Sequence, residues 1–123
     1  LYFVASPLQY LAARRIAEAN GFDDHIANSL ACDERGRLTG EGVLRVELTN
    51  KRLALERFQQ KYGVPAERTV AIGNSFVDVS MFSASGLSIA FNPIDEAVER
   101  SADVVLRSKD LRDVLGPILG HSL

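Results

Sequence analysis

The sequence predicts an α/β fold, in which a parallel sheet is covered by helices on both faces. The first indication is an alternation of strand and helix patterns that repeats three times between residues 69 and 119. The second is that the expected strands are short apolar runs, which is typical of parallel strands buried on both faces. The expected pairs are 69–72 with 77–85, 87–91 with 93–101, and 104–107 with 110–119. Together they predict a three-layer, Rossmann-like core.

The first part of the chain adds one more strand and helix. Residues 1–5 are expected to form a buried strand, after which Ser6 caps a helix that starts at Pro7 and ends at Asn20-Gly21. The apolar face of that helix is expected to hold Leu8, Leu11, Ala12, Ile16 and Ala19.

Residues 26–48 follow a different pattern, with two short strands, 26–32 and 43–48, around turn-rich segments that include Gly40-Glu41-Gly42. They predict a hairpin-like excursion. A helix over 49–62 follows, ended by Gly63 and Pro65. No linker or repeat interrupts the sequence, so residues 1–123 are expected to form a single domain.

The composition of the chain limits the classes of molecule that it is expected to bind. The chain has 123 residues, 46% of them hydrophobic and 24% charged, which is typical of a soluble globular domain. Its formal net charge is −2 with no long block of like charge, so nucleic acid and acidic membranes are not expected as partners. A lone cysteine, Cys32, excludes an internal disulfide and favours a cytoplasmic location. We expect small, diffusible partners. Because the sequence begins without Met inside an expected strand, we expect it to be part of a longer chain.

Some reactive residue types are expected to have no role in a site. Cys32 is expected to be a small core residue, and His25 and His121 to lie at the surface. The sequence has no glycine-rich phosphate loop and no His/Cys cluster with metal-ligand spacing.

Five other residues carry the functional interpretation. Ser6 follows a strand, and its hydroxyl is either a helix cap or part of a phosphate site. Lys51 begins the core-facing stripe of its helix, so its ammonium either extends to solvent or meets an anion. Asp78 lies on the inner face of the next helix, either as a cap or as a site residue. Asn74 and Ser75 are turn or cap residues taken singly, but they follow a strand whose carboxyl end would face a ligand. An anion site at one edge of the sheet explains all of these positions together.

With these positions placed, the chain resembles the haloacid dehalogenase superfamily of phosphatases, and within it the phosphoserine phosphatase branch. The segment ending at Ser6 resembles the second family motif, and Lys51 resembles the lysine of the third. The tract from Gly73 through Asp78 to Phe82 resembles the fourth. The resemblance implies that Ser6 and Lys51 bind phosphate, that Lys51 and Asp78 are catalytic, and that Asn74 and Asp78 serve a magnesium ion. Because truncating Lys51 also removes a desolvated charge, Lys51→Ala in the full-length protein is expected to abolish phosphate or vanadate binding with little loss of stability.

Two features depart from the family pattern. The Asp-x-Asp-x-Thr motif, whose first aspartate forms an aspartyl-phosphate, is not in this chain and would lie upstream with the cap domain. The strand that carries it would lie between the strands that end at Ser6 and Ile72. Asn74 replaces the usual magnesium-binding aspartate, so metal binding is expected to be weaker.

The resemblance predicts a phosphoric monoester hydrolase of a small phosphorylated metabolite. This chain alone is expected to be inactive, and to pair with the missing amino-terminal segment or to form a homodimer. Two alternatives remain at this point: a metal-free dehalogenase, and a non-catalytic phosphate-binding or interaction module.

Overall fold

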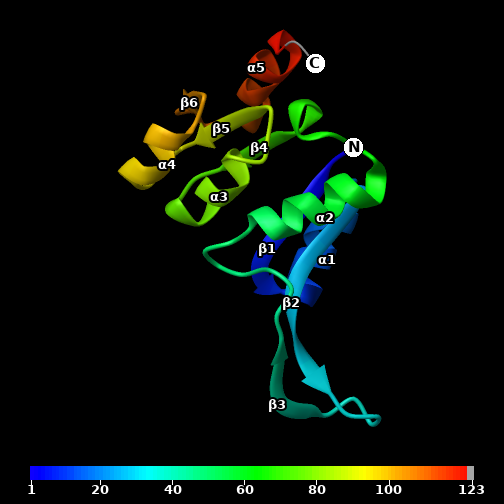
Figure 1. Cartoon of the computed structure of the whole chain (residues 1–123). Helices are drawn as coiled ribbons and strands as arrows, with labels where there is room; N and C mark the ends of the chain where they lie inside the picture. Colours follow the sequence, from blue (N-terminus) through cyan, green and yellow to red (C-terminus); the bar gives the residue numbers. More distant parts are fainter. Residues whose placement is uncertain (122–123) are drawn as a thin grey trace. The chain divides into compact units, whose positions relative to one another are not determined.

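The structure, a computed structural model, describes residues 1–121 (Figure 1). The chain divides into two compact units, Leu1–Leu48 and Thr49–Leu123. Within the described residues, the backbone hydrogen bonds form two three-stranded sheets, one in each unit. No helix in residues 1–121 is long and apolar enough to cross a membrane.

The first unit contains β1 (Phe3–Gln9), α1 (Tyr10–Ala19), β2 (Asp24–Cys32) and β3 (Leu38–Val43). β1 and β2 are parallel, with Phe3 opposite Asp24 and Ser6 opposite Ala27. β2 continues beyond this pairing and forms an antiparallel ribbon with β3 (Figure 1).

The prediction that Ser6 caps the first helix is wrong. Ser6 lies inside β1, and α1 begins after Gln9, whose side chain accepts a hydrogen bond from the Leu11 N–H at 2.7 Å. The reason is local, because the residue before a proline prefers extended backbone, and a proline can stay in a strand where the register is irregular. The pairing of β1 with β2 shifts between Ser6 and Gln9, which is where Pro7 lies.

The predicted apolar face of this helix is also wrong. The buried residues of α1 are Ala13 and Ala17, whereas Leu11 and Ile16 are exposed. Ala13 and Ala17 are four residues apart and small, so they let the helix approach the strands closely. The side chain of Leu8 lies outside what the structure describes.

The second strand of the ribbon lies earlier in the sequence than predicted. β3 covers 38–43 and includes Gly40-Glu41-Gly42, which the sequence suggested as a turn. Glycine is compatible with a strand where the pairing is irregular. Gly40 has a φ of 88°, and the register shifts between Leu30 and Cys32 on the partner strand.

Cys32 and His25, two residues of β2 that were expected to have no role in a site, differ in burial from the prediction. Cys32 is exposed and is not part of the core. His25 lies within β2, half-buried beside the ring of Tyr10, and within the described residues its buried Nε2 has no hydrogen-bond partner.

The second unit matches the predicted alternation. Its helices and strands are α2 (Arg52–Tyr62), η1 (Ala66–Arg68), β4 (Val70–Gly73), η2 (Phe76–Asp78), α3 (Val79–Phe82), β5 (Leu87–Phe91), α4 (Glu96–Ser101), β6 (Val104–Leu106), η3 (Leu111–Val114) and α5 (Leu115–Gly120). β4, β5 and β6 form a parallel sheet in that order, with Val70 opposite Leu87 and Ile89 opposite Val104. α2 ends at Tyr62 and is followed by Gly63, as the sequence predicted, and the φ of 64° at Gly63 is left-handed.

Helices cover both faces of this sheet (Figure 1). On one face, Leu55 of α2, Met81 and Phe82 of α3 and Val98 of α4 pack with Ala71 and Ala90. On the other face, Val114 of η3 and Ile118 of α5 pack with Leu87 and Ile89. The predicted α/β class, a parallel sheet between two helical layers, is confirmed in this unit.

Candidate functional site

Lys51 is a buried cation at the start of α2. Its residue is only 8% exposed, and Leu55 and Phe58 continue the buried side of the helix. The Lys51 Nζ lies 2.6 Å from Asp78 Oδ1. Of the two alternatives left by the sequence, the ammonium therefore meets an anion and does not extend to solvent.

Both carboxylate oxygens of Asp78 accept hydrogen bonds from other residues of the chain. The residue is 5% exposed. Its Oδ1 contacts Lys51, while its Oδ2 accepts hydrogen bonds from the N–H groups of Asn74 at 2.9 Å and Ser75 at 3.3 Å. Ser75 and Asp78 form a reciprocal capping box at the start of η2. Asp78 thus holds Lys51 with one oxygen and folds the loop after β4 with the other.

Gly73 makes this arrangement possible. A Cβ on Gly73 would lie 2.3 Å from the Cβ of Asp78 and 2.6 Å from its Oδ2. No side chain fits in that space. The glycine at the end of β4 is therefore required for the carboxylate to fold back over the turn.

Asn74 is the polar side chain that the site leaves exposed. Its backbone N–H is held by Asp78, and its carbonyl accepts a hydrogen bond from the Ile94 N–H at 2.9 Å. Ser75, the neighbouring cap residue, is half-buried. The structure thus brings together Lys51, Asn74, Ser75 and Asp78 at the carboxyl end of β4. Ser6 lies in the first unit, half-buried in β1.

Sequence reasoning missed Asp95, which ties the loop after β5 to the site loop. Its Oδ2 accepts a hydrogen bond from the Phe76 N–H at 2.7 Å, and its Oδ1 accepts one from the Val98 N–H at 2.9 Å. An aspartate three residues before a buried valine is a recognisable N-cap pattern for α4, and that signal was available. The link to Phe76 could not be read, because the donor is a backbone amide 19 residues away.

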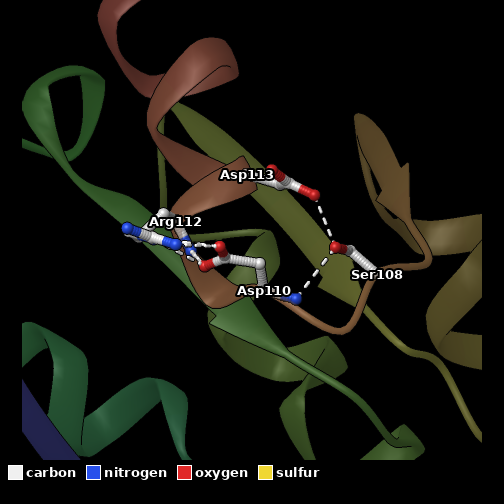
Figure 2. A network of polar contacts seen from close by, with 4 residues as sticks. All are labelled: Ser108, Asp110, Arg112 and Asp113. Carbon is white, nitrogen blue, oxygen red and sulfur yellow. Dashed lines mark hydrogen bonds and ion pairs between the residues drawn. The ribbon is translucent and has the colours of Figure 1, made fainter.

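The loop after β5 is fastened in turn to the segment after β6. The Asn92 side chain donates to the Ser108 carbonyl at 2.8 Å and accepts from the Ser108 N–H at 3.0 Å. Figure 2 shows how Ser108 is held, with its hydroxyl bonded to Asp113 and to the Asp110 N–H. Arg112 binds the Asp110 carboxylate, and this hydrogen bond lowers the pKa of Asp110 below its usual value. Three consecutive loops at this edge of the sheet are therefore joined by polar contacts.

The donor set of the described residues does not by itself fit a magnesium ion. Magnesium in proteins is usually held by one or two carboxylates together with water and phosphate oxygens. The Asp78 carboxylate is already occupied by an ammonium and two amides, and Asn74 offers a neutral oxygen. Within residues 1–121, no group of three or more His, Cys, Asp or Glu residues could hold a metal. The metal roles of Asn74 and Asp78 stay predictions.

Comparison with known proteins gives one matching family. The family model for haloacid dehalogenase-like hydrolases matches residues 42–115. The phosphoserine phosphatase of Methanocaldococcus jannaschii is 37% identical over 108 residues, which cover 85% of this chain and 49% of that protein. Phosphoserine phosphatase SerB2 of Mycobacterium tuberculosis is 43% identical over 81 residues, covering 65% of this chain and 20% of that protein.

Solved structures agree with the sequence comparison. The crystal structure of a phosphoserine phosphatase in apo form has a TM-score of 0.83 and 34% identity, covering 94% of this chain and 57% of that chain. A phospho-aspartyl intermediate analogue of phosphoserine phosphatase has a TM-score of 0.81 at the same 34% identity, covering 94% of this chain and 55% of that one. The chain thus spans about half the length of the Methanocaldococcus relative and of these solved chains.

Proposed function

Because the chain belongs to the haloacid dehalogenase-like hydrolase family, we propose that the protein carrying it hydrolyses a phosphate monoester of a small metabolite, as a phosphoserine phosphatase does. The observation that carries this proposal is the buried Lys51 held at the carboxyl end of β4. A cation that the fold keeps out of water is suited to neutralise the charge on a transferring phosphoryl group.

Each residue of the site has a separate proposed role. Lys51 contributes the positive charge, and Asp78 fixes the position of its ammonium. Asn74 presents an exposed amide to the ligand. Ser6 is proposed as a second phosphate-binding residue. Lys51 and Asp78 are thus proposed as the catalytic pair of this chain, with Asp78 acting through Lys51.

The nucleophile is proposed to come from outside residues 1–123. In the proposed reaction a carboxylate attacks phosphorus, the substrate alkoxide leaves, and water then hydrolyses the aspartyl-phosphate. Asp78 is not suited to this role, because its two oxygens already accept hydrogen bonds from Lys51, Asn74 and Ser75. One of the similar solved structures is a phospho-aspartyl intermediate analogue of phosphoserine phosphatase, which supports this route.

A magnesium requirement is retained as part of the proposal, although these residues do not build a metal site alone. The carboxylates that such a site needs would also lie outside residues 1–123. The neutral Asn74 favours one second candidate, a non-catalytic phosphate-binding module. The chain is also proposed to be one part of a single core domain in a cytoplasmic protein, with no nucleic-acid or membrane partner.

The test uses the full-length protein and measures phosphate released from O-phosphoserine and from p-nitrophenyl phosphate. The double variant Lys51→Met/Asp78→Asn removes the ion pair without leaving an unpaired charge, and should lower kcat/KM by about a hundredfold or more. Lys61→Met is the matched control, because Lys61 is an exposed lysine of the same helix. No hydrolysis by the unaltered protein, combined with tight vanadate binding, would favour the binding module.

A further inference from the structure

The backbone of the loop that presents Asn74 is held from two sides. From the core side, Asp78 accepts hydrogen bonds from the N–H groups of Asn74 and Ser75. From the other side, the Ile94 N–H donates to the Asn74 carbonyl, and Asp95 accepts from the Phe76 N–H. Four backbone groups over three consecutive residues thus have fixed partners.

Of the two groups that hold the loop from the other side, the Ile94 N–H and the Asp95 carboxylate, only the carboxylate is charged. Its two oxygens bond the first N–H of η2 and the Val98 N–H within α4, so one carboxylate caps both short helices. Hydrogen bonds to a carboxylate are stronger than those between neutral groups. The 2.7 Å bond to Phe76 is therefore suited to fixing the angle at which the chain leaves β4.

The segment that carries Asp95 is itself anchored. Asn92 has a φ of 47°, its N–H donates to the Leu106 carbonyl, and its side chain makes two hydrogen bonds with the Ser108 backbone. Ser108 is in turn held by the contacts shown in Figure 2. The backbone that carries Asp95 is therefore held in place. The Asp95 carboxylate can thus fix the position of the Phe76 amide that it binds.

We propose that Asp95 is a positioning residue, which sets the conformation of the loop 74–76 and so the placement of Asn74 at the carboxyl end of β4. The functional part of this inference rests on the proposed function. Asp95 itself touches no reacting group in this scheme. It acts through the Phe76 amide.

The alternative is that Asp95 serves only to cap α4, and the variant Asp95→Ser separates the two roles. Serine is as good an N-cap as aspartate, so α4 keeps its cap. The shorter side chain cannot also reach the Phe76 N–H. Asp103→Ser is the matched control, because Asp103 also accepts a backbone N–H, that of Ser88, but at the opposite end of β5.

The experiment is done on the full-length protein with two readouts. Amide hydrogen exchange at residues 74–76 should become about tenfold faster or more in Asp95→Ser and stay unchanged in Asp103→Ser, as the loss of one charge-assisted hydrogen bond predicts. The dissociation constant for orthovanadate should rise by a similar factor. Removing a negative charge would by itself tighten anion binding, so weaker binding can only come from the altered loop.

The outcomes separate this inference from the proposed function. Unchanged exchange at residues 74–76 in Asp95→Ser would overturn the positioning role, whatever the protein does. Faster exchange with unchanged vanadate affinity would overturn the claim that the positioning serves the site. If the unaltered protein neither binds vanadate nor hydrolyses phosphomonoesters, the proposed function fails, and the exchange rates still decide whether Asp95 holds the loop.

Discussion

Lys51 and Asp78 form an ion pair with 2.6 Å between Nζ and Oδ1, and both residues are less than 10% exposed. They lie 27 residues apart in the sequence, at the start of α2 and at the end of η2. The other Asp78 oxygen, Oδ2, accepts hydrogen bonds from two backbone amides of the loop after β4. The ion pair therefore joins α2 to that loop.

Breaking this pair should be costly. Sequence reasoning expected the loss of Lys51 to affect stability little, but the structure reverses that expectation, because the Asp78 charge would stay buried without its partner. Lys51→Met should lower the free energy of unfolding by about 3–5 kcal/mol, whereas Lys51→Met/Asp78→Asn should recover most of that loss. Urea denaturation of the two variants of the full-length protein measures the difference. Equal losses in both would show that the pair contributes little.

Gly73 should tolerate no side chain. In Gly73→Ala the new Cβ would overlap Asp78, so the loop must shift, at a cost of about 1–3 kcal/mol or more. Gly120→Ala is the control, because a Cβ at the last position of α5 would meet no atom within 4 Å beyond its chain neighbours and its own helix, and stability should change by less than about 0.5 kcal/mol. Thermal unfolding gives both values. A stable Gly73→Ala protein would mean that Asp78 does not fold back over β4.

Asn74 should limit the affinity for a divalent cation. Asn74→Asp in the full-length protein adds a negative charge to an exposed position of the site, and magnesium binding should become tighter. Titration calorimetry with Asn74→Ala beside it measures the change. Weaker or unchanged binding in Asn74→Asp would show that residue 74 is not a metal ligand.

The part of the fold that the sequence predicted well is the part with the simplest pattern. β5 has the predicted bounds, because an apolar run buried on both faces leaves little ambiguity. The start of α1 was missed, because Ser6-Pro7 is also a helix-start signal and only the pairing with β2 decides between the two. The ribbon was misplaced because the glycines of β3 suggested a turn.

The candidate site, like the fold, could be predicted from the sequence only in part. The burial of Lys51 was readable as a cation on an apolar stripe, since that placement follows from helical spacing alone. Asp95 was not readable as a site residue, because its partner is the amide of Phe76, and a backbone amide leaves no mark in the sequence. Contacts between loops that follow different strands depend on how the strands are ordered, and residue types do not state that order.

The last prediction is that residues 1–123, expressed alone, neither hydrolyse phosphomonoesters nor behave as a stable monomer. Lys51 and Asn74 are proposed to face the ligand, but the buried carboxylate of Asp78 is engaged by three hydrogen bonds and cannot attack phosphorus. Both β1 and β4 are edge strands of their sheets, so each exposes a row of backbone groups. Such edges tend to pair with another chain, and a buried unpaired group costs about 1–3 kcal/mol against a total stability of roughly 5–15 kcal/mol. We therefore expect the chains to associate, or to pair with a further segment of the protein.

Sedimentation and thermal unfolding of the purified chain, together with a p-nitrophenyl phosphate assay, test this prediction. Turnover of that substrate, or a monomer with a sharp two-state transition, would contradict it.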